Sequence, residues 1–167
     1  MINVQDRDGQ APIHIAAEAG QDSCIAMLAT MKADLNMTNT DWKAPIHLAI
    51  ESGYSSCIAV LVRKGADINL PHKGLPPIHM AAIFNADHCI ETLVNMRADV
   101  NLKDSDGVTA AMFATGQGHT ACVKALIALK ADINIRANLG EHCLQLAKTY
   151  FAEDDDLMEI LKAAGAH

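Results

Sequence analysis

The chain has 167 residues; half are hydrophobic and 20% are charged, which is enough apolar sequence for a packed core and argues against disorder. Its formal net charge of −7 argues against nucleic acid or an anionic membrane surface as a partner, because those partners call for a basic face. No apolar run approaches the roughly 20 residues of a membrane span, and the N-terminus lacks a signal-peptide pattern. We therefore expect an intracellular protein, cytoplasmic and monomeric.

One stretch of sequence recurs along the chain. The first copy, repeat 1, reads APIHIAAEAGQDSCIAMLATMKADLN over residues 11–36. Repeats 2 to 5 follow at 44–69, 76–101, 109–134 and, in degraded form, 142–167. Self-similarity at a fixed period is the signature of stacked structural repeats, so we expect one repeat domain that spans 1–167.

Each repeat predicts two short helices and a turn. Pro45 is followed by apolar residues at helical spacing, which predicts a first helix that begins at the proline. A second amphipathic segment, 55–64, ends before Gly65, where a left-handed residue would close the helix. Asp-Gly pairs between the repeats predict tight hairpin turns.

These units resemble the ankyrin-repeat family, whose helix pairs carry a Thr-Pro-Leu-His motif. The motif stands in this chain as Ala11-Pro12-Ile13-His14, Ala44-Pro45-Ile46-His47 and Pro76-Pro77-Ile78-His79. The resemblance implies an all-α repeat solenoid of helix-turn-helix units joined by β-hairpin tips. It also implies a non-catalytic module that binds a protein or peptide partner and holds no cofactor.

The chain departs from the family pattern at two kinds of position. Lys32, Arg97 and Lys130 replace the glycine that usually follows the second helix, and only Gly65 matches it. A side chain in the left-handed region costs about 1 kcal/mol, partly offset by a cation at the end of a helix. The fourth motif, 109–112, lacks both the proline and the histidine. We expect the units around these positions to be locally softer.

The recurring histidines and cysteines are interpreted as structural. His14, His47 and His79 occur once per repeat, roughly 10 Å apart, which is too far for a shared metal ion. They stand at the structural histidine of the ankyrin motif, and the resemblance implies that each imidazole bonds the backbone of the adjacent turn. A ladder of cysteines follows the same period and predicts buried, reduced thiols: Cys24, Cys57, Cys89 and Cys122. Cys143 follows His142, but adjacent helical residues point apart, so core packing is favoured over a nucleophile.

A candidate modification site recurs in repeats 1 to 4. The family resemblance implies that an asparaginyl hydroxylase can act on an Asn that follows Asp-aliphatic, here Asn36, Asn69, Asn101 and Asn134. The alternative, which we favour, is that these side chains hold the hairpins through hydrogen bonds to the backbone.

The variable surface predicts where a partner binds. Family resemblance implies the hairpin tips and the exposed face of the first helices. The tips offer Arg7, Asp8, Thr40, Asp41, Trp42, Lys43, Lys73, Leu75, Ser105, Asp106 and Val108. The helix face offers Glu18, Glu51, Ile83, Phe84, Gln117 and Tyr150.

Trp42 is the sharpest of these candidates. It is the only tryptophan, it replaces a turn glycine, and tryptophan is enriched in binding hot spots. With Ile83 and Phe84 it predicts an apolar strip at repeats 2 and 3, flanked by Glu18 and Glu51. The alternative is that Trp42 folds over its neighbouring hairpin and Phe84 packs locally.

A second function stays open at this stage. The chain begins without a polar capping unit, and terminal repeats need a polar outer face. This favours a targeting or regulatory ankyrin segment of a larger multidomain protein, which could be an enzyme. No set of residues predicts a catalytic or metal site within the chain itself.

Overall fold

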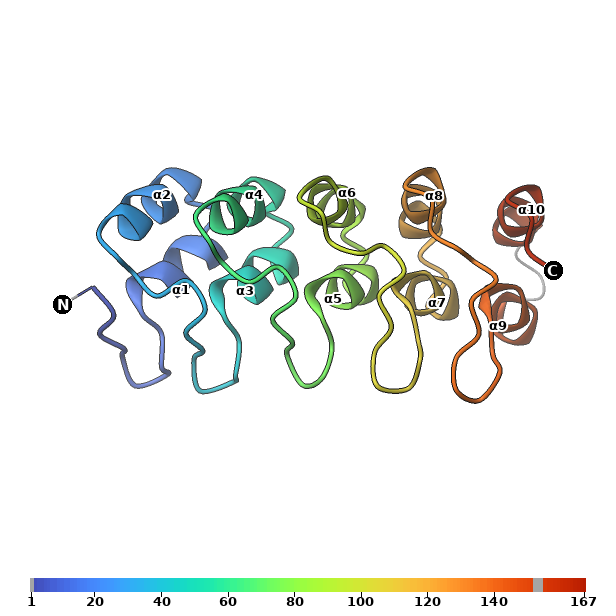
Figure 1. Cartoon of the computed structure of the whole chain (residues 1–167), viewed down its shortest axis with the longest axis horizontal. Helices are drawn as coiled ribbons and strands as arrows, with labels where there is room; N and C mark the ends of the chain where they lie inside the picture. The colour runs from blue at the N-terminus through green and yellow to red at the C-terminus, as the bar shows by residue number, and fades with distance from the viewer. Residues whose placement is uncertain (1, 152–154) are drawn as a thin grey trace.

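The computed structural model describes residues 2–151 and 155–167, which form ten short α-helices arranged as five pairs (Figure 1). The helices are α1 (Pro12–Glu18), α2 (Asp22–Thr30), α3 (Pro45–Glu51), α4 (Ser55–Arg63), α5 (Pro77–Ile83), α6 (Asp87–Asn95), α7 (Ala110–Gly116), α8 (Thr120–Ala128), α9 (Cys143–Tyr150) and α10 (Asp155–Ala163).

The helices form two layers. The odd-numbered helices pack side by side next to the tips, and α2, α4, α6 and α8 stack in the layer above them (Figure 1). Each helix also packs on its partner in the same repeat, α10 on α9 included. The predicted all-α repeat solenoid is confirmed. Between the layers lies a continuous core of small and branched apolar residues, in which alanines allow the close approach of the helices.

The first helices begin as the motif predicts, with proline in the first turn and a histidine that ties the turn to the next tip. The Nδ1 of His14 accepts from the N–H of Ala11 at 3.1 Å, and its Nε2 bonds the carbonyl of Met37 at 2.9 Å. His47 makes the equivalent two bonds in repeat 2. The predicted structural role of these histidines is confirmed. His79 lacks the first of these bonds, and its Nε2 bonds a different carbonyl of the next tip, that of Val108, which lies 29 residues on instead of 23.

The second helices end in the backbone conformation that the sequence predicted. Lys32, Arg97 and Lys130 have φ of 65°, 76° and 70°, and Gly65 has φ of 104°. The left-handed region is therefore occupied whether or not glycine is present. This prediction is confirmed.

The tips are tight hydrogen-bonded turns rather than β-ladders. In the tip of repeat 2, the side-chain oxygen of Asn39 accepts from the N–H groups of Asp41 and Lys43 at 3.0 and 2.9 Å. Asp6 and Asp104 make the same pair of bonds in their tips. The described residues contain isolated β-bridges but no strand, because each arm of a tip is too short to extend a ladder.

The tip that opens repeat 3 is one residue shorter than its neighbours. Lys73 and Gly74 both have positive φ, 51° and 82°, and His72 pairs with Leu75 through two backbone hydrogen bonds of 3.0 Å. This is the geometry of a two-residue type I′ turn. It accounts for the shorter spacing between repeats 2 and 3 in the sequence.

The structure corrects one expectation about the cysteines. Cys57, Cys89 and Cys122 are buried as predicted, but Cys24 is exposed. The reason is its place in the stack: each buried thiol is covered by the preceding helix pair, whereas α2 has no described helix on that side.

Candidate functional site

A groove, called groove A, lies between repeats 2 and 3 where the tips meet the first helices. It has a volume of about 320 Å³. Six residues that the sequence predicted as binding residues lie together there, joined by two that it did not name. The lining consists of Lys43, Glu51, Leu75, Ile83, Phe84 and Lys73, with His72 and Met80.

The polar rim of groove A is ordered by short contacts. The ammonium of Lys43 lies 2.8 Å from the carboxylate of Glu51, and both side chains are half-buried. His72 is buried, and its Nδ1 lies 3.2 Å from the carbonyl of Trp42. Because a carbonyl can only accept, this contact makes Nδ1 the donor and leaves Nε2 unprotonated in the neutral ring. Lys73 is exposed and has no ion-pair partner among the described residues.

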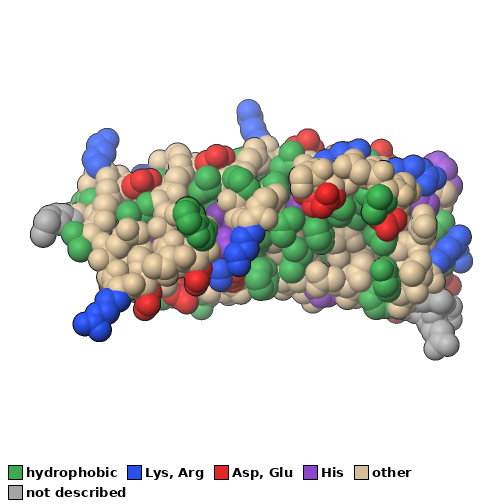
Figure 2. Space-filling model, turned by 90° about the horizontal axis from the view of Figure 1, so that it is seen from below, with side chains coloured by type: hydrophobic (Ala, Val, Ile, Leu, Met, Phe, Trp, Pro, Cys, Tyr) green, Lys and Arg blue, Asp and Glu red, His purple; other side chains and the backbone are tan. Residues whose placement is uncertain are grey.

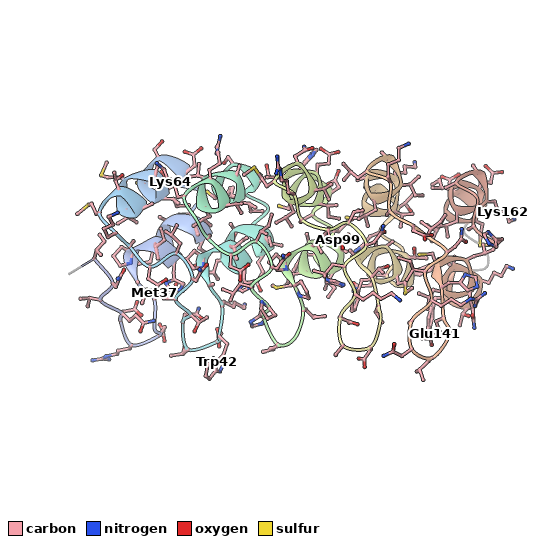
Figure 3. The ribbon with its side chains drawn as sticks, viewed as in Figure 1. Met37, Trp42, Lys64, Asp99, Glu141 and Lys162 are labelled. Atoms are coloured by element: carbon pink, nitrogen blue, oxygen red, sulfur yellow. The ribbon has the colours of Figure 1, made fainter. Side chains whose placement is uncertain are left out.

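Trp42 stands beside groove A on the tip of repeat 2 and points away from the body of the protein (Figure 3). Its side chain is 71% exposed, so the alternative that it folds over a neighbouring hairpin is wrong. Its φ of 64° lies in the left-handed region, which Gly9 and Gly107 occupy at the same place in other tips. A bulky side chain is strained there, and such strain gathers at functional positions.

A second groove, groove B, lies between repeats 4 and 5 and has a volume of about 280 Å³. It contains three predicted residues, Val108, Gln117 and Tyr150. The remaining lining residues are Met112, Phe113, Gly116, Ala137, Glu141 and Leu146. Apolar surface therefore also occurs beyond the strip predicted at repeats 2 and 3, at the other end of the face.

The other predicted surface residues lie outside both grooves. Arg7, Asp8 and Glu18 are exposed on repeat 1. The hydroxyl of Thr40 donates a hydrogen bond to the carbonyl of Asp8, at 2.8 Å, and so joins two tips. Three further predicted residues are exposed at tips: Asp41, Ser105 and Asp106. The backbone carbonyls of Ser105 and Asp106 accept hydrogen bonds from Asn138.

The repeated asparagines link neighbouring repeats. The side-chain oxygen of Asn36 accepts from the N–H of Asp67 at 2.9 Å, and Asn101 and Asn134 make equivalent bonds one repeat further on. Asn69 has no such bond among the described residues, in the repeat that precedes the shortened tip. Hydrogen bonding to the backbone is thus observed at three of the four sites, but it runs to the following repeat rather than within one hairpin.

The buried cysteines are poor candidates for chemistry. Burial raises the pKa of Cys89 to about 11, of Cys122 to about 12 and of Cys143 to about 11. The reactive form of a cysteine is the thiolate, so these thiols stay protonated at neutral pH. The described residues bring together no group of three potential metal ligands, and they include no helix long and apolar enough to cross a membrane.

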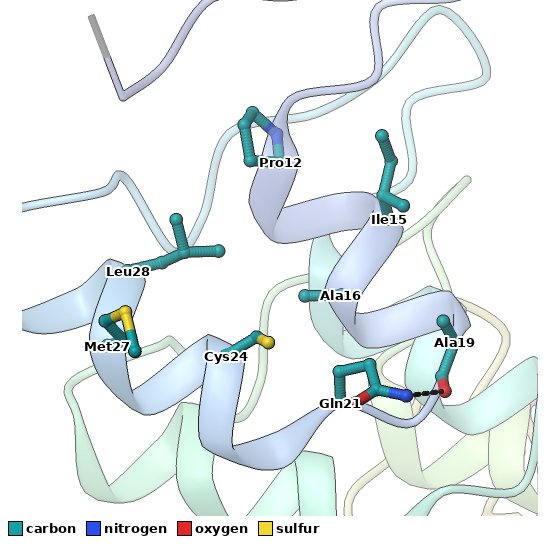
Figure 4. A pocket seen from close by; sticks show the side chains of 8 residues that line it. All are labelled: Pro12, Ile15, Ala16, Ala19, Gln21, Cys24, Met27 and Leu28. Atoms are coloured by element: carbon teal, nitrogen blue, oxygen red, sulfur yellow. Dashed lines mark hydrogen bonds between the residues drawn. The ribbon is translucent and has the colours of Figure 1, made fainter.

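A third groove, apolar and of about 430 Å³, lies on the outer side of α1 and α2 (Figure 4). Its lining includes Ile15 and Cys24. The same positions of repeat 2 are Leu48 and Cys57, which are 5% and 0% exposed because α1 and α2 cover them. The groove is therefore a stacking surface of the repeat, and its shape follows from the fold.

Three groove residues that the sequence analysis missed share one position in the repeat. Met80, Phe113 and Leu146 line the grooves at the place that Leu48 takes in repeat 2. Aligning the repeats would have grouped them, because each lies three residues after the residue that begins its first helix. His72 carried no such signal, since it belongs to the shortened turn.

A model of the protein family described as ankyrin repeats (3 copies) matches residues 1–72 and again residues 71–137. A search of curated proteins finds no match. Ankyrin repeats generally mediate interactions between proteins. The two matches together cover most of the chain, and they agree with the stacked helix pairs of the structure: the chain belongs to the ankyrin-repeat family.

Proposed function

We propose that this chain is a non-catalytic module that binds a protein partner through groove A and the adjoining tip of Trp42. The strained and exposed side chain of Trp42 carries the proposal. A glycine would remove the strain at this turn, as Gly9 and Gly107 do in theirs, so the tryptophan costs stability without packing against the fold.

Groove A supports the proposal through its chemistry. It combines apolar side chains, among them Phe84 at 48% exposure, with a rim of charged groups held in fixed positions. Hot spots of protein interfaces join large aromatic anchors to a polar rim in this way.

The cysteines and the net charge bear on where the chain acts and on which class of partner it binds. We infer a monomeric chain that acts inside the cell, because its free thiols are typical of a reducing compartment. The net charge of −7 disfavours nucleic acid and anionic membranes as partners. Trp42 and Phe84 are the residues whose loss should matter most.

Affinity capture from a native lysate tests the function. The double variant Trp42→Gly, Phe84→Ala should lose the partner that the wild type retains. The single variant Trp42→Gly should also weaken capture, and it should unfold at a higher denaturant concentration, because glycine at residue 42 relieves about 1 kcal/mol of backbone strain. Binding and folding would then change in opposite directions, which excludes misfolding as the cause.

Met31→Ala is the matched control, because Met31 is a 58% exposed apolar residue in the loop that follows α2, outside both grooves. It should leave capture unchanged. Addition of the isolated partner should shift the emission of Trp42 to shorter wavelength as the indole leaves water. Equal capture by the double variant and the wild type would show that the binding surface lies elsewhere.

A further inference from the structure

We propose that the partner presents an extended peptide segment with two apolar side chains about six residues apart, one seated in groove A and the other in groove B. This inference rests on the proposed function and adds the second groove, the conformation of the ligand and its pattern of charge.

The two grooves are built in the same way. Phe84 and Tyr150 occupy the same position in repeats 3 and 5, and they are 48% and 65% exposed. Each aromatic ring stands beside an apolar residue of the same first helix, Met80 in groove A and Leu146 in groove B. Grooves A and B are thus built from the same positions of the repeat and open on the same side of the stack.

The separation of the grooves selects an extended ligand. Two repeats separate them, and helices pack 8–10 Å apart, so the grooves lie roughly 16–20 Å from each other. An extended chain rises about 3.3 Å per residue, which places the two anchors five or six residues apart. Because alternate residues of an extended chain face opposite sides, only the even spacing of about six puts both anchors on the protein. A helical segment of that length would span only about 9 Å.

Charge distinguishes the two ends. Lys73 is the unpaired cation at the rim of groove A, since Lys43 is bound to Glu51. Glu141 lines groove B, and no cation pairs with its carboxylate among the described residues. An acidic residue beside the first anchor and a basic residue beside the second would complement both. Figure 2, which looks onto the tips, shows hydrophobic side chains gathered on this face among isolated basic and acidic ones.

Gly116 offers a way to close groove B without harming the fold. A methyl group built at this position meets no atom within 4 Å. The residue ends α7 with ordinary helical geometry and lines the groove. Gly116→Leu should therefore fill the seat of the second anchor while the protein stays folded, because glycine is a poor helix residue in any case.

Selection from a phage-displayed library of random peptides tests the proposal. The immobilised chain should enrich sequences with two apolar residues about six positions apart, an acidic residue next to one and a basic residue next to the other. Synthetic peptides of the enriched sequence, with the spacing reset to about four or eight, should bind roughly tenfold more weakly in fluorescence polarisation. Enrichment of helical or single-anchor sequences, or of no sequence at all, would overturn the proposal.

Protein variants complete the test with the same peptides. Phe84→Ala, Tyr150→Ala and Gly116→Leu should each weaken binding roughly tenfold, and Met31→Ala should not. The exchange Lys73→Glu with Glu141→Lys should favour peptides whose charges are exchanged. If the natural partner depends on Trp42 and Phe84 but is insensitive to Tyr150→Ala and Gly116→Leu, the two-groove ligand is wrong while the proposed function stands.

Discussion

The first turn of α5 differs from those of α1 and α3 by one backbone hydrogen. Pro76 stands where Ala11 and Ala44 donate their N–H groups to a histidine, and proline has no N–H to give. His79 must donate through Nε2 to the carbonyl of Val108, at 3.0 Å, so its Nδ1 is a buried acceptor. No described group donates to it. An unsatisfied buried acceptor costs about 1–3 kcal/mol.

Pro76→Ala should therefore stabilise the protein, although alanine also frees the unfolded chain. The loss of proline costs about 0.4–1 kcal/mol through that entropy, which leaves a net gain on the order of 0.5–1 kcal/mol. Urea unfolding measures it. Pro71→Ala is the control, because Pro71 is exposed and the substitution frees the chain without satisfying a buried atom. A lower midpoint for Pro76→Ala would show that the histidine does not need this donor.

At the scale of single residues, part of the bonding of these histidines could be predicted from the sequence. The sequence shows that Pro76 takes the first position of the motif, where the other two copies have Ala11 and Ala44. The histidines were also predicted to bond the backbone. What the letters do not contain is the pairing of each Nδ1 with the residue that precedes its own helix. That pairing depends on the ring orientation, which the next tip fixes from 23 residues away in the case of His14.

The helix pair is the repeating element of this fold. The residue that follows each pair in the left-handed region can therefore be compared from one repeat to the next. In repeats 1 to 4 the residue two positions after the end of the second helix is Lys32, Gly65, Arg97 and Lys130 in turn, and all four have positive φ. Three of the four therefore hold a side chain in a region that favours glycine, at about 1 kcal/mol each. The units around them are expected to be softer than repeat 2.

Arg97→Gly should raise the free energy of unfolding by roughly 1 kcal/mol, and Gly65→Lys should lower it by a similar amount. Arg97→Lys should change little, because it keeps both the strain and the charge. Amide exchange adds the local readout: protection of α6 should increase in Arg97→Gly more than protection of α2. Uniform protection across the repeats of the wild type, a lower free energy of unfolding for Arg97→Gly, or a higher one for Gly65→Lys would contradict the argument.

The bounds of the helices could be predicted, because one repeat is enough to define them. Features formed where two repeats meet were harder to predict. Pro45 and Gly65 mark the first helix start and the second helix end of repeat 2, and the structure agrees. Groove A takes residues from two repeats around a turn that is one residue shorter than the others, so its lining depends on that turn. The exposure of Cys24 likewise depends on what stacks on α2, which the repeat pattern alone does not state.

The stack as a whole shares one response to acid. Burial lowers the pKa of His14, His47 and His79 below the usual value, so each folded ring resists the proton that the unfolded chain accepts. Where the unfolded state binds more protons, stability rises with pH. The stabilisation is therefore fully present above the unfolded pKa of about 6.5 and is lost as pH falls towards the lower folded values.

Acidification from about pH 7.5 to about pH 5.5 should thus lower the urea midpoint, and it should do so unevenly along the solenoid. Repeats 1 to 3 each contain one of these histidines, whereas repeat 4 has Met112 in that position and a helix start held by the Thr109 hydroxyl. Because each repeat contacts mainly its neighbours, the loss of amide protection should be largest in α1 to α6 and smaller in α7 and α8. His88→Gln, at an exposed histidine, should leave the pattern unchanged. An acid response confined to repeat 4, or a midpoint that does not move, would place the control of stability outside these three rings.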